Sequence, residues 1–204
     1  LGPGEAETLV EGVPAASAPR LALVVGEELH GSLALPLAGG RWRAVAAEPG
    51  AMRFAAVSEA EQALLGMIET VGDIASGRGI AAVHARLAGL RDGPKAEEVL
   101  AAAGAGEAIP SAVRDLMLGV LGRVAGDLVL ATGAWGGVWL SGGVASAWEA
   151  GWTDALLPHS VYKGPMTERM RHVPIRRIRH PEPALLGLAA LAEDDPAWQR
   201  GPAC

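Results

Sequence analysis

Apolar residues recur at helical spacing through the middle of the chain, between residues 111 and 132. Positions three or four residues apart lie on one face of an α-helix, and the apolar positions here are Val113, Leu116, Met117, Val120, Leu121, Val124, Leu128 and Val129. A short apolar run at 138–140 follows, and the paired glycines Gly142 and Gly143 come directly after it. This order predicts a long helix, a buried strand and a tight turn into a further helix.

Three strands are predicted before that helix, near the start of the chain. Residues 20–25 form an apolar run, residues 31–37 form a second strand, and Gly39-Gly40 predicts a hairpin turn into residues 42–46. An antiparallel meander is the simplest arrangement of three strands joined by short turns. Residues 1–19 are rich in glycine and proline, so we expect them to form a loop.

Ser58 has the sequence context of a helix N-cap, because Glu61 stands three positions later, as in a capping box. We expect this helix to end near Gly72 and to present Leu64, Leu65 and Ile68 to the core. The remaining expected elements are helices at 80–90, 96–103 and 183–192, a last strand at 172–178, and a polar tail at 193–204.

The composition limits the class of protein. With 204 residues, half of them hydrophobic, the chain can bury a core of ordinary size in one or two domains. The formal net charge of −6 argues against a nucleic-acid surface, and the basic run at 176–179 is expected to occupy solvated strand positions. Cys204 is the only cysteine, which fits a reducing cytoplasm and excludes a disulfide framework. No apolar run approaches membrane-spanning length, so we expect no membrane partner.

Several motifs occur together in a fixed order. The sequence G-G-V-W-L-S-G-G at 136–143 follows the long helix, and the segments 162–166, 172–175 and 183–187 match K-G-R/P-[FM], x-[IV]-P-[VI] and x-G-L-L-G elements. This series resembles the bacterial glucokinase family of sugar kinases. The resemblance implies an α/β fold of the ribonuclease-H-like (actin-like ATPase) type, with a mixed sheet flanked by helices. It also implies ATP and Mg²⁺ as cofactors, glucose phosphorylated at its 6-hydroxyl, and a homodimer as a further expectation.

The resemblance implies nucleotide-binding roles for four glycines. Gly142 and Gly143 stand at the turn that contacts adenosine in the family, and glycine lets a ligand approach the backbone. A tight strand-to-helix connection without a ligand is the alternative. Gly26 and Gly31 bound the turn where relatives carry a G-A-G-T-G-L-G phosphate loop.

That phosphate turn departs from the family pattern. Glu27 and Glu28 stand where polyphosphate approaches in relatives, and carboxylates repel phosphates at contact range. Two alternatives remain at this stage: the carboxylates hold a metal ion together with His30, or the turn is solvated.

The sugar motif is partly present. Relatives carry G-E-G-G-H-V-D-F, and here Glu48 matches its glutamate while Ala51 takes the histidine position. A further family glutamate falls on Gly72, with Asp73 next to it. The resemblance therefore implies Glu48 and Asp73 as the sugar-binding candidates, and an exposed strand end is the alternative for Glu48.

Two family motifs do not occur in this sequence: the D-[VI]-G-G-T-N hairpin and the N-D-[FL] segment with the catalytic aspartate. We therefore expect residues 1–192 to correspond to the C-terminal (large) lobe, with the N-terminal lobe absent. No catalytic residue and no metal ligand is expected in the chain, which should be inactive alone. The alternative is a non-catalytic, degenerate sugar-kinase homologue with a structural or regulatory role.

Overall fold

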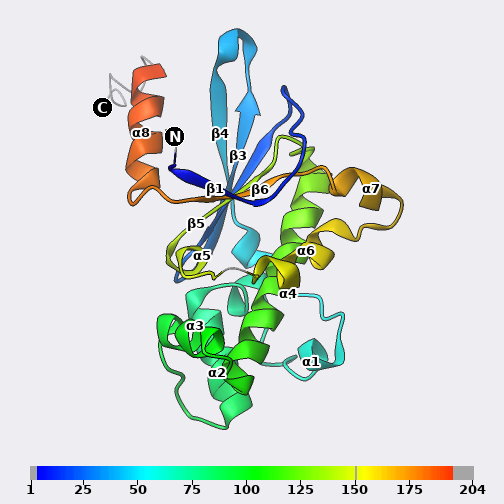
Figure 1. Cartoon of the computed structure of the whole chain (residues 1–204), viewed down its shortest axis with the longest axis vertical. Coiled ribbons are helices and arrows are strands. Elements are labelled where there is room, and N and C mark those ends of the chain that lie inside the picture. Colours follow the sequence, from blue (N-terminus) through cyan, green and yellow to red (C-terminus); the bar gives the residue numbers. More distant parts are fainter. Residues whose placement is uncertain (1–3, 150, 195–204) are drawn as a thin grey trace.

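The computed structural model describes residues 4–149 and 151–194 of the chain (Figure 1). At its centre is a mixed six-stranded sheet in the order β1-β6-β5-β2-β3-β4. The strands are β1 (Ala6–Val10), β2 (Arg20–Val25), β3 (Leu29–Pro36), β4 (Trp42–Ala47), β5 (Val138–Ser141) and β6 (Ile175–Ile178).

The sheet combines antiparallel and parallel pairs. β2, β3 and β4 form the antiparallel meander expected from the sequence. β5 joins the other edge of β2 in parallel, with Leu21 opposite Val138 and Leu23 opposite Leu140. β6 is parallel to β5, and β1 closes that side antiparallel to β6.

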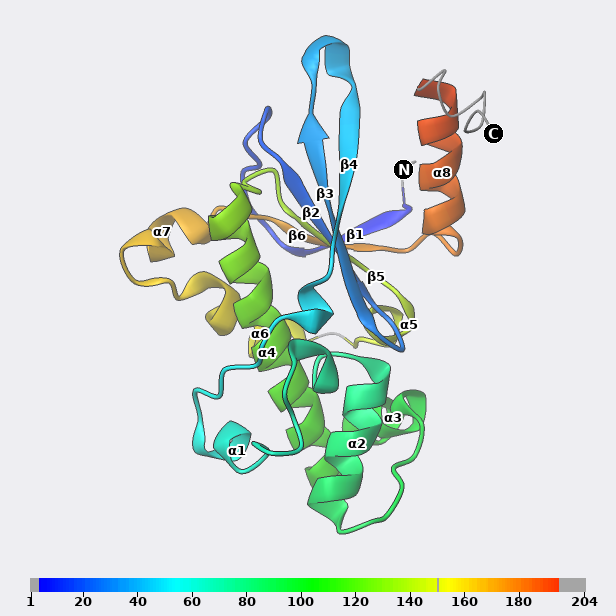
Figure 2. The same ribbon diagram turned by 180° about the vertical axis from the view of Figure 1, so that it is seen from behind.

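Helices cover the sheet and extend beyond it. The α-helices of the described part are α1 (Glu59–Gln62), α2 (Gly77–Ala88), α3 (Ala96–Gly104), α4 (Ala108–Thr132), α5 (Gly143–Ser146), α6 (Thr153–Val161), α7 (Thr167–Met170) and α8 (Pro183–Asp194). Short 3-10 turns are η1 (Ala38–Gly40), η2 (Pro49–Ala51), η3 (Val71–Asp73) and η4 (Gly164–Met166). Figure 2 shows α4 running from the sheet down to the group formed by α1, α2 and α3.

The long helix predicted at 111–132 is α4, and glycines on it allow a neighbouring helix to come close. A Cβ atom at Gly122 or Gly126 would collide with the backbone carbonyl oxygens of Leu156 and Ser160 on α6. Glycine in a helix interior costs roughly 0.5–1 kcal/mol relative to alanine. Here that cost is offset by the close packing of α4 on α6.

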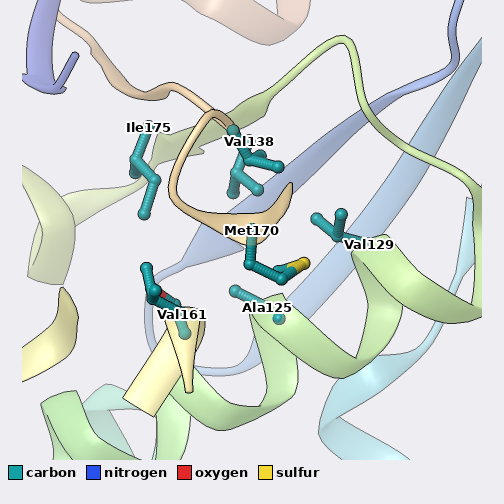
Figure 3. Close-up of a pocket in the computed structure, with 9 residues that line it drawn as sticks. Ala125, Val129, Val138, Val161, Met170 and Ile175 are labelled. Atoms are coloured by element: carbon teal, nitrogen blue, oxygen red, sulfur yellow. The ribbon is translucent and has the colours of Figure 1, made fainter. Parts of the chain in front are cut away.

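The alternation of β2 separates the core from the site. Leu21, Leu23 and Val25 are at most 1% exposed and face the core, as period-two alternation requires. Ala22 and Val24 face the other side of the sheet and line a surface cavity. Between α4 and the sheet, a gap of about 10 Å³ is surrounded mainly by apolar side chains such as Val129, Val138 and Met170 (Figure 3). A gap of that size barely admits one water molecule, so it is a packing defect and not a ligand site.

Two sequence predictions about secondary structure are wrong. Residues 6–10 were expected in a loop, but they form β1, because β6 offers a free edge with which they pair. The helix expected from Ser58 to near Gly72 is only α1. Ser58 does cap it, accepting from the Glu61 backbone N–H at 3.2 Å. Gly66, with φ of 90°, adopts a conformation that ends regular helix soon afterwards.

The short α1 also changes the burial of its surroundings. Leu64 and Ile68 are buried as expected, but Leu65 is 55% exposed. The Glu61 carboxylate does not return to the N-cap amide of Ser58. It accepts instead from the Val57 backbone N–H at 2.8 Å and pairs with Arg123 of α4.

The prediction that residues 176–179 occupy solvated positions is wrong for Arg177. This residue is only 5% exposed, because its guanidinium has carboxylate and carbonyl partners inside the fold. The final predicted helix is α8, whose apolar residues Leu185, Leu186 and Leu188 are exposed. Residues 195–204 of the predicted polar tail lie outside the described residues.

Candidate functional site

A cavity of about 490 Å³ opens beside the turn at Gly142 and Gly143. Its size falls within the range of roughly 300–1,000 Å³ that is usual for ligand pockets. The walls come from β2, from the β5–α5 turn and from the segment between β6 and α8; the lining residues are Ala22, Val24, Ser141, Gly142, Gly143, Ser146, Ile178, Arg179, His180, Pro181, Pro183 and Ala184.

The two glycines of this turn have different structural roles. Gly142 has φ of 98°, and a Cβ atom there would lie 2.5 Å from the Val25 carbonyl oxygen, so the fold itself requires glycine. At Gly143, no atom beyond its chain neighbours and the backbone of its own helix lies within 4 Å of the position a Cβ would take. The bare backbone of Gly143 therefore leaves space in which a ligand can approach the main chain.

Arg177 fixes the segment that follows this turn. Its Nη1 donates to the carbonyl oxygens of Ala145 at 3.1 Å and Trp148 at 2.8 Å. Its Nε and Nη2 donate to Glu7 Oε2 at 3.1 and 2.6 Å. The hydrogen bond from Arg177 outweighs the opposing effect of burial and, with Arg179, holds the pKa of the Glu7 carboxyl below its ordinary value of 4.5.

The acidic turn at 26–31 is anchored on the start of α2. The Gly77 backbone N–H donates to the Gly26 carbonyl oxygen at 2.7 Å, and Glu27 Oε2 lies beside Gly77. Glu28 is exposed, but it pairs with His30 Nε2 at 3.5 Å and with Arg78 Nη1 at 3.6 Å. Gly26 and Gly31 are not among the residues that line the cavity at Gly142 and Gly143.

A second, smaller cavity of about 190 Å³ surrounds Glu48. It brings together three positions identified in the sequence analysis: Glu48, Ala51 and Gly72. The structure adds Thr70 and three residues of the acidic turn and α2: Glu28, His30 and Arg78. The Glu48 side chain is 65% exposed and is held by His30 Nδ1 at 2.9 Å.

The Asp73 carboxylate accepts hydrogen bonds from nearby backbone N–H groups. Its Oδ2 accepts from the backbone N–H groups of Thr70 at 2.9 Å and Glu69 at 3.1 Å. Burial would raise the pKa of the Asp73 carboxyl, but these donors hold its pKa below the ordinary value of 3.8. Asp73 is not among the residues lining the Glu48 cavity.

Sequence reasoning missed the contact between His30 and Glu48. The two residues are 18 positions apart, and only the β3–β4 pairing brings their strand ends together. The predicted meander placed the two strands side by side without a register, and Ala47, the partner of Gly31, lies one residue beyond the predicted strand at 42–46. Within residues 4–149 and 151–194, no group of three or more His, Cys, Asp or Glu side chains is arranged to hold a metal ion. The same residues contain no helix long and apolar enough to cross a bilayer.

Comparison with known proteins gives this geometry a context. The Glucokinase family model matches residues 1–195. The glucokinase of Paramagnetospirillum magneticum is 31% identical over 196 residues, which are 90% of this chain and 61% of that protein. A glucokinase of Xanthomonas campestris is 35% identical over 123 residues, which are 58% of this chain and 37% of that protein. This chain thus spans less than two thirds of the length of either relative.

Solved structures agree on the fold. The crystal structure of a glucokinase from an Antarctic psychrotroph superposes with a TM-score of 0.80 at 22% identity, covering 96% of this chain and 64% of that one. A ROK family glucokinase from Streptomyces griseus superposes with a TM-score of 0.63 at 20% identity, covering 89% and 62%. The mixed sheet and its flanking helices therefore define an actin-like sugar-kinase fold, as the sequence predicted. Within that class, the chain belongs to the Glucokinase family.

Proposed function

We propose that this chain is the large, C-terminal lobe (residues 1–192) of a cytoplasmic kinase that transfers the γ-phosphoryl group of ATP to the 6-hydroxyl of glucose. The observation that carries the proposal is the turn at Gly142 and Gly143. It walls a cavity of about 490 Å³, and its Gly143 backbone is open to that cavity. The Streptomyces griseus relative was solved in complex with glucose and AMPPNP, which supports both ligands as the ones to test here.

The cavity at Gly142 and Gly143 suits the adenosine part of ATP. Its lining includes apolar surface from Val24 and Ile178 and polar groups from Ser141 and Ser146, the mixture that orients a small ligand. No Asp or Glu is among its lining residues, so these residues do not fit a protein-held Mg²⁺ site. Mg²⁺ enters this proposal only as a companion of the ATP phosphates.

A sugar kinase also needs a base that accepts the proton of the attacking hydroxyl. We infer that a further lobe, corresponding to the part of the relatives that this chain does not span, supplies that base. Helix α8 supports this inference, because Leu185, Leu186 and Leu188 are exposed on one apolar helix. Both views show α8 standing apart from the other helices, beside β1 (Figures 1 and 2). A second copy of the chain, as a homodimer, is the other partner to test.

A non-catalytic homologue is the second candidate, and the acidic turn favours it. Glu27 and Glu28 stand in the turn that corresponds to the family's phosphate loop, and both side chains are exposed. Such a protein would keep the adenosine cavity and lose the affinity for ATP phosphates. The relative affinity for adenosine and ATP therefore separates the two candidates.

The proposal is tested by calorimetric titration of the chain with adenosine and with D-glucose. We expect both to bind. Gly143→Val should abolish adenosine binding, because its side chain fills the open space beside the backbone, while glucose binding and the circular dichroism spectrum stay unchanged. Adenosine binding that survives Gly143→Val would remove the assignment of this cavity, and a chain that binds neither ligand would contradict the proposed function.

A further inference from the structure

The Glu48 cavity contains an imidazole that the family sugar motif does not account for. His30 is the second residue of β3, and its neighbour Leu29 is buried in the core at 2% exposure. Because successive strand side chains point to opposite faces, His30 is directed away from that core. Its ring lies between two carboxylates, with Nδ1 2.9 Å from Glu48 Oε2 and Nε2 3.5 Å from Glu28 Oε2.

The protonation of His30 follows from its partners. A carboxylate only accepts hydrogen bonds, so in the short contact with Glu48 the proton sits on Nδ1. In a neutral imidazole, Nε2 is then an acceptor, and it faces an oxygen of Glu28 that is also an acceptor. No hydrogen joins those two atoms until the ring is charged or a ligand supplies a donor between them.

This arrangement selects a class of ligand. Glu48, His30 Nε2 and Glu28 offer acceptors around one cavity, while the cation Arg78 is paired with Glu28 at 3.6 Å. The volume of about 190 Å³ is below the range for drug-sized ligands and suits a small one. A neutral ligand rich in hydroxyl donors, such as a monosaccharide, matches these acceptors. A sugar phosphate would bring negative charge against Glu28 and Glu48.

We propose that His30 is the imidazole of the sugar site in this chain. It orients the Glu48 carboxylate through Nδ1 and accepts a hydrogen bond from a hydroxyl of the sugar through Nε2. Ala51, at the position where relatives carry a histidine, lines the same cavity. His30 of β3 and residue 51 thus line one cavity from different elements, and His30 supplies the imidazole that residue 51 lacks. This inference rests on the proposed function, because it assumes that the Glu48 cavity binds sugar.

Calorimetry with D-glucose tests the role of His30. His30→Ala should weaken glucose binding at least tenfold, and the double variant His30→Ala/Ala51→His should recover most of that loss. His172→Ala, a change of an exposed histidine outside the cavity, should leave the affinity unchanged. Glucose 6-phosphate should bind the wild-type chain at least tenfold more weakly than glucose. Glucose affinity that is the same in His30→Ala and wild type would overturn the inference while leaving the proposed function intact.

Imidazole ¹⁵N spectra of the wild-type chain provide a second test that needs no folded variant. The spectrum should show neutral His30 as the Nδ1–H tautomer, and adding glucose should move its Nε2 resonance. A His30 resonance that does not move while calorimetry detects glucose would also overturn the inference. Absence of glucose binding to the wild-type chain would instead contradict the proposed function, and this inference with it.

Discussion

Nη2 of Arg177 on β6 lies 2.6 Å from Oε2 of Glu7 on β1, and the same guanidinium donates to the carbonyl oxygens of Ala145 and Trp148. One buried cation therefore joins the first strand of the chain to the segment after the Gly142–Gly143 turn. Oε2 of Glu7 also lies 3.2 Å from Nη1 of Arg179, a residue that lines the cavity. The edge strand β1 is in this way part of the support for the larger cavity.

Replacement of Glu7 should change how the stability of the fold depends on pH. Because the folded-state pKa of Glu7 is below its ordinary value of 4.5, the ionised form stabilises the fold above that value. This stabilisation is lost as the pH falls through the lower folded-state pKa. In Glu7→Gln, the unfolding temperature should be lower than wild type at pH 7, and the difference should shrink between about pH 5 and pH 3.

Thermal melts over that pH range provide the measurement. Glu11→Gln removes an exposed carboxylate from the same segment outside this ion pair and serves as the matched control. Its melting curves should follow wild type at pH 7. Equal melting temperatures for Glu7→Gln and wild type at pH 7 would show that the Arg177–Glu7 contact contributes nothing to stability.

The pair Glu61–Arg123 should contribute strongly because it is largely buried. The two atoms Arg123 Nη1 and Glu61 Oε1 lie 2.8 Å apart, and the side chains are 17% and 5% exposed. Arg123→Met leaves a buried carboxylate without its cation, and should cost about 3–5 kcal/mol in the free energy of unfolding. The double variant Glu61→Met/Arg123→Met should recover most of that loss, since no charge then remains buried.

Urea denaturation of the single and double variants measures these differences. The exposed pair of Glu168 and Arg171, with side chains 83% and 63% exposed, is the comparison. Arg171→Met should cost less than about 1 kcal/mol. If Arg123→Met proved as mild as Arg171→Met, the buried pair would not hold α1 to α4 as described.

The acidic turn should discriminate against phosphate. If Glu27 and Glu28 face the nucleotide phosphates, wild type should bind adenosine at least as well as ATP. Glu27→Gln/Glu28→Gln should then raise ATP affinity selectively, and the gain should shrink as salt screens the charges. Titration with both ligands at low and high salt checks this. The matched control is Glu97→Gln/Glu98→Gln, which removes two carboxylates from the first turn of α3. An equal gain in ATP affinity in this control would show that the effect comes from the net charge of the chain and not from the acidic turn.

The exposed leucines of α8 should make the isolated chain self-associate. Leu185 and Leu188 are 61% and 48% exposed on one helix, and a contiguous exposed apolar patch often marks an interaction site. Leu185→Glu/Leu188→Glu should lower the weight-average mass in sedimentation at high protein concentration. If wild type and variant both sediment as monomers at every protein concentration, α8 does not bind a second copy of this chain.

Much of the fold follows from local patterns. The strand at 138–140 and the helix α4 were predicted from apolar positions that are buried or half-buried in the fold. The meander from residue 20 was predicted from its apolar runs and hairpin turn, although much of β3 and β4 is half-buried or exposed. β1 was missed because its five residues acquire strand conformation only by pairing with β6, which is more than 160 positions away. Arg177 was misjudged for the same reason: sequence shows a basic run, and only the tertiary fold supplies the acceptors that allow a guanidinium to be buried.

The site was predictable where it depends on backbone shape. Gly142 has the positive φ that a paired-glycine turn suggested, and Gly143 lines a cavity. Glu48 lies in a separate cavity with Ala51 and Gly72, two of the positions that depart from the family motifs. The partnership of His30 with Glu48 depends on strand register and side-chain direction, which a motif does not contain. The ligand-binding roles of all six candidates stay predictions: Gly26, Gly31, Gly142, Gly143, Glu48 and Asp73.

A coupled assay of glucose phosphorylation by the purified chain, run beside calorimetry on the same preparation, tests the central claim most directly. We predict that the chain binds glucose and adenosine but yields no glucose 6-phosphate above the buffer blank, because we propose that the base that accepts the hydroxyl proton lies in another lobe. Turnover with Mg²⁺ and ATP that follows this polypeptide through purification and is lost in Gly143→Val would contradict it.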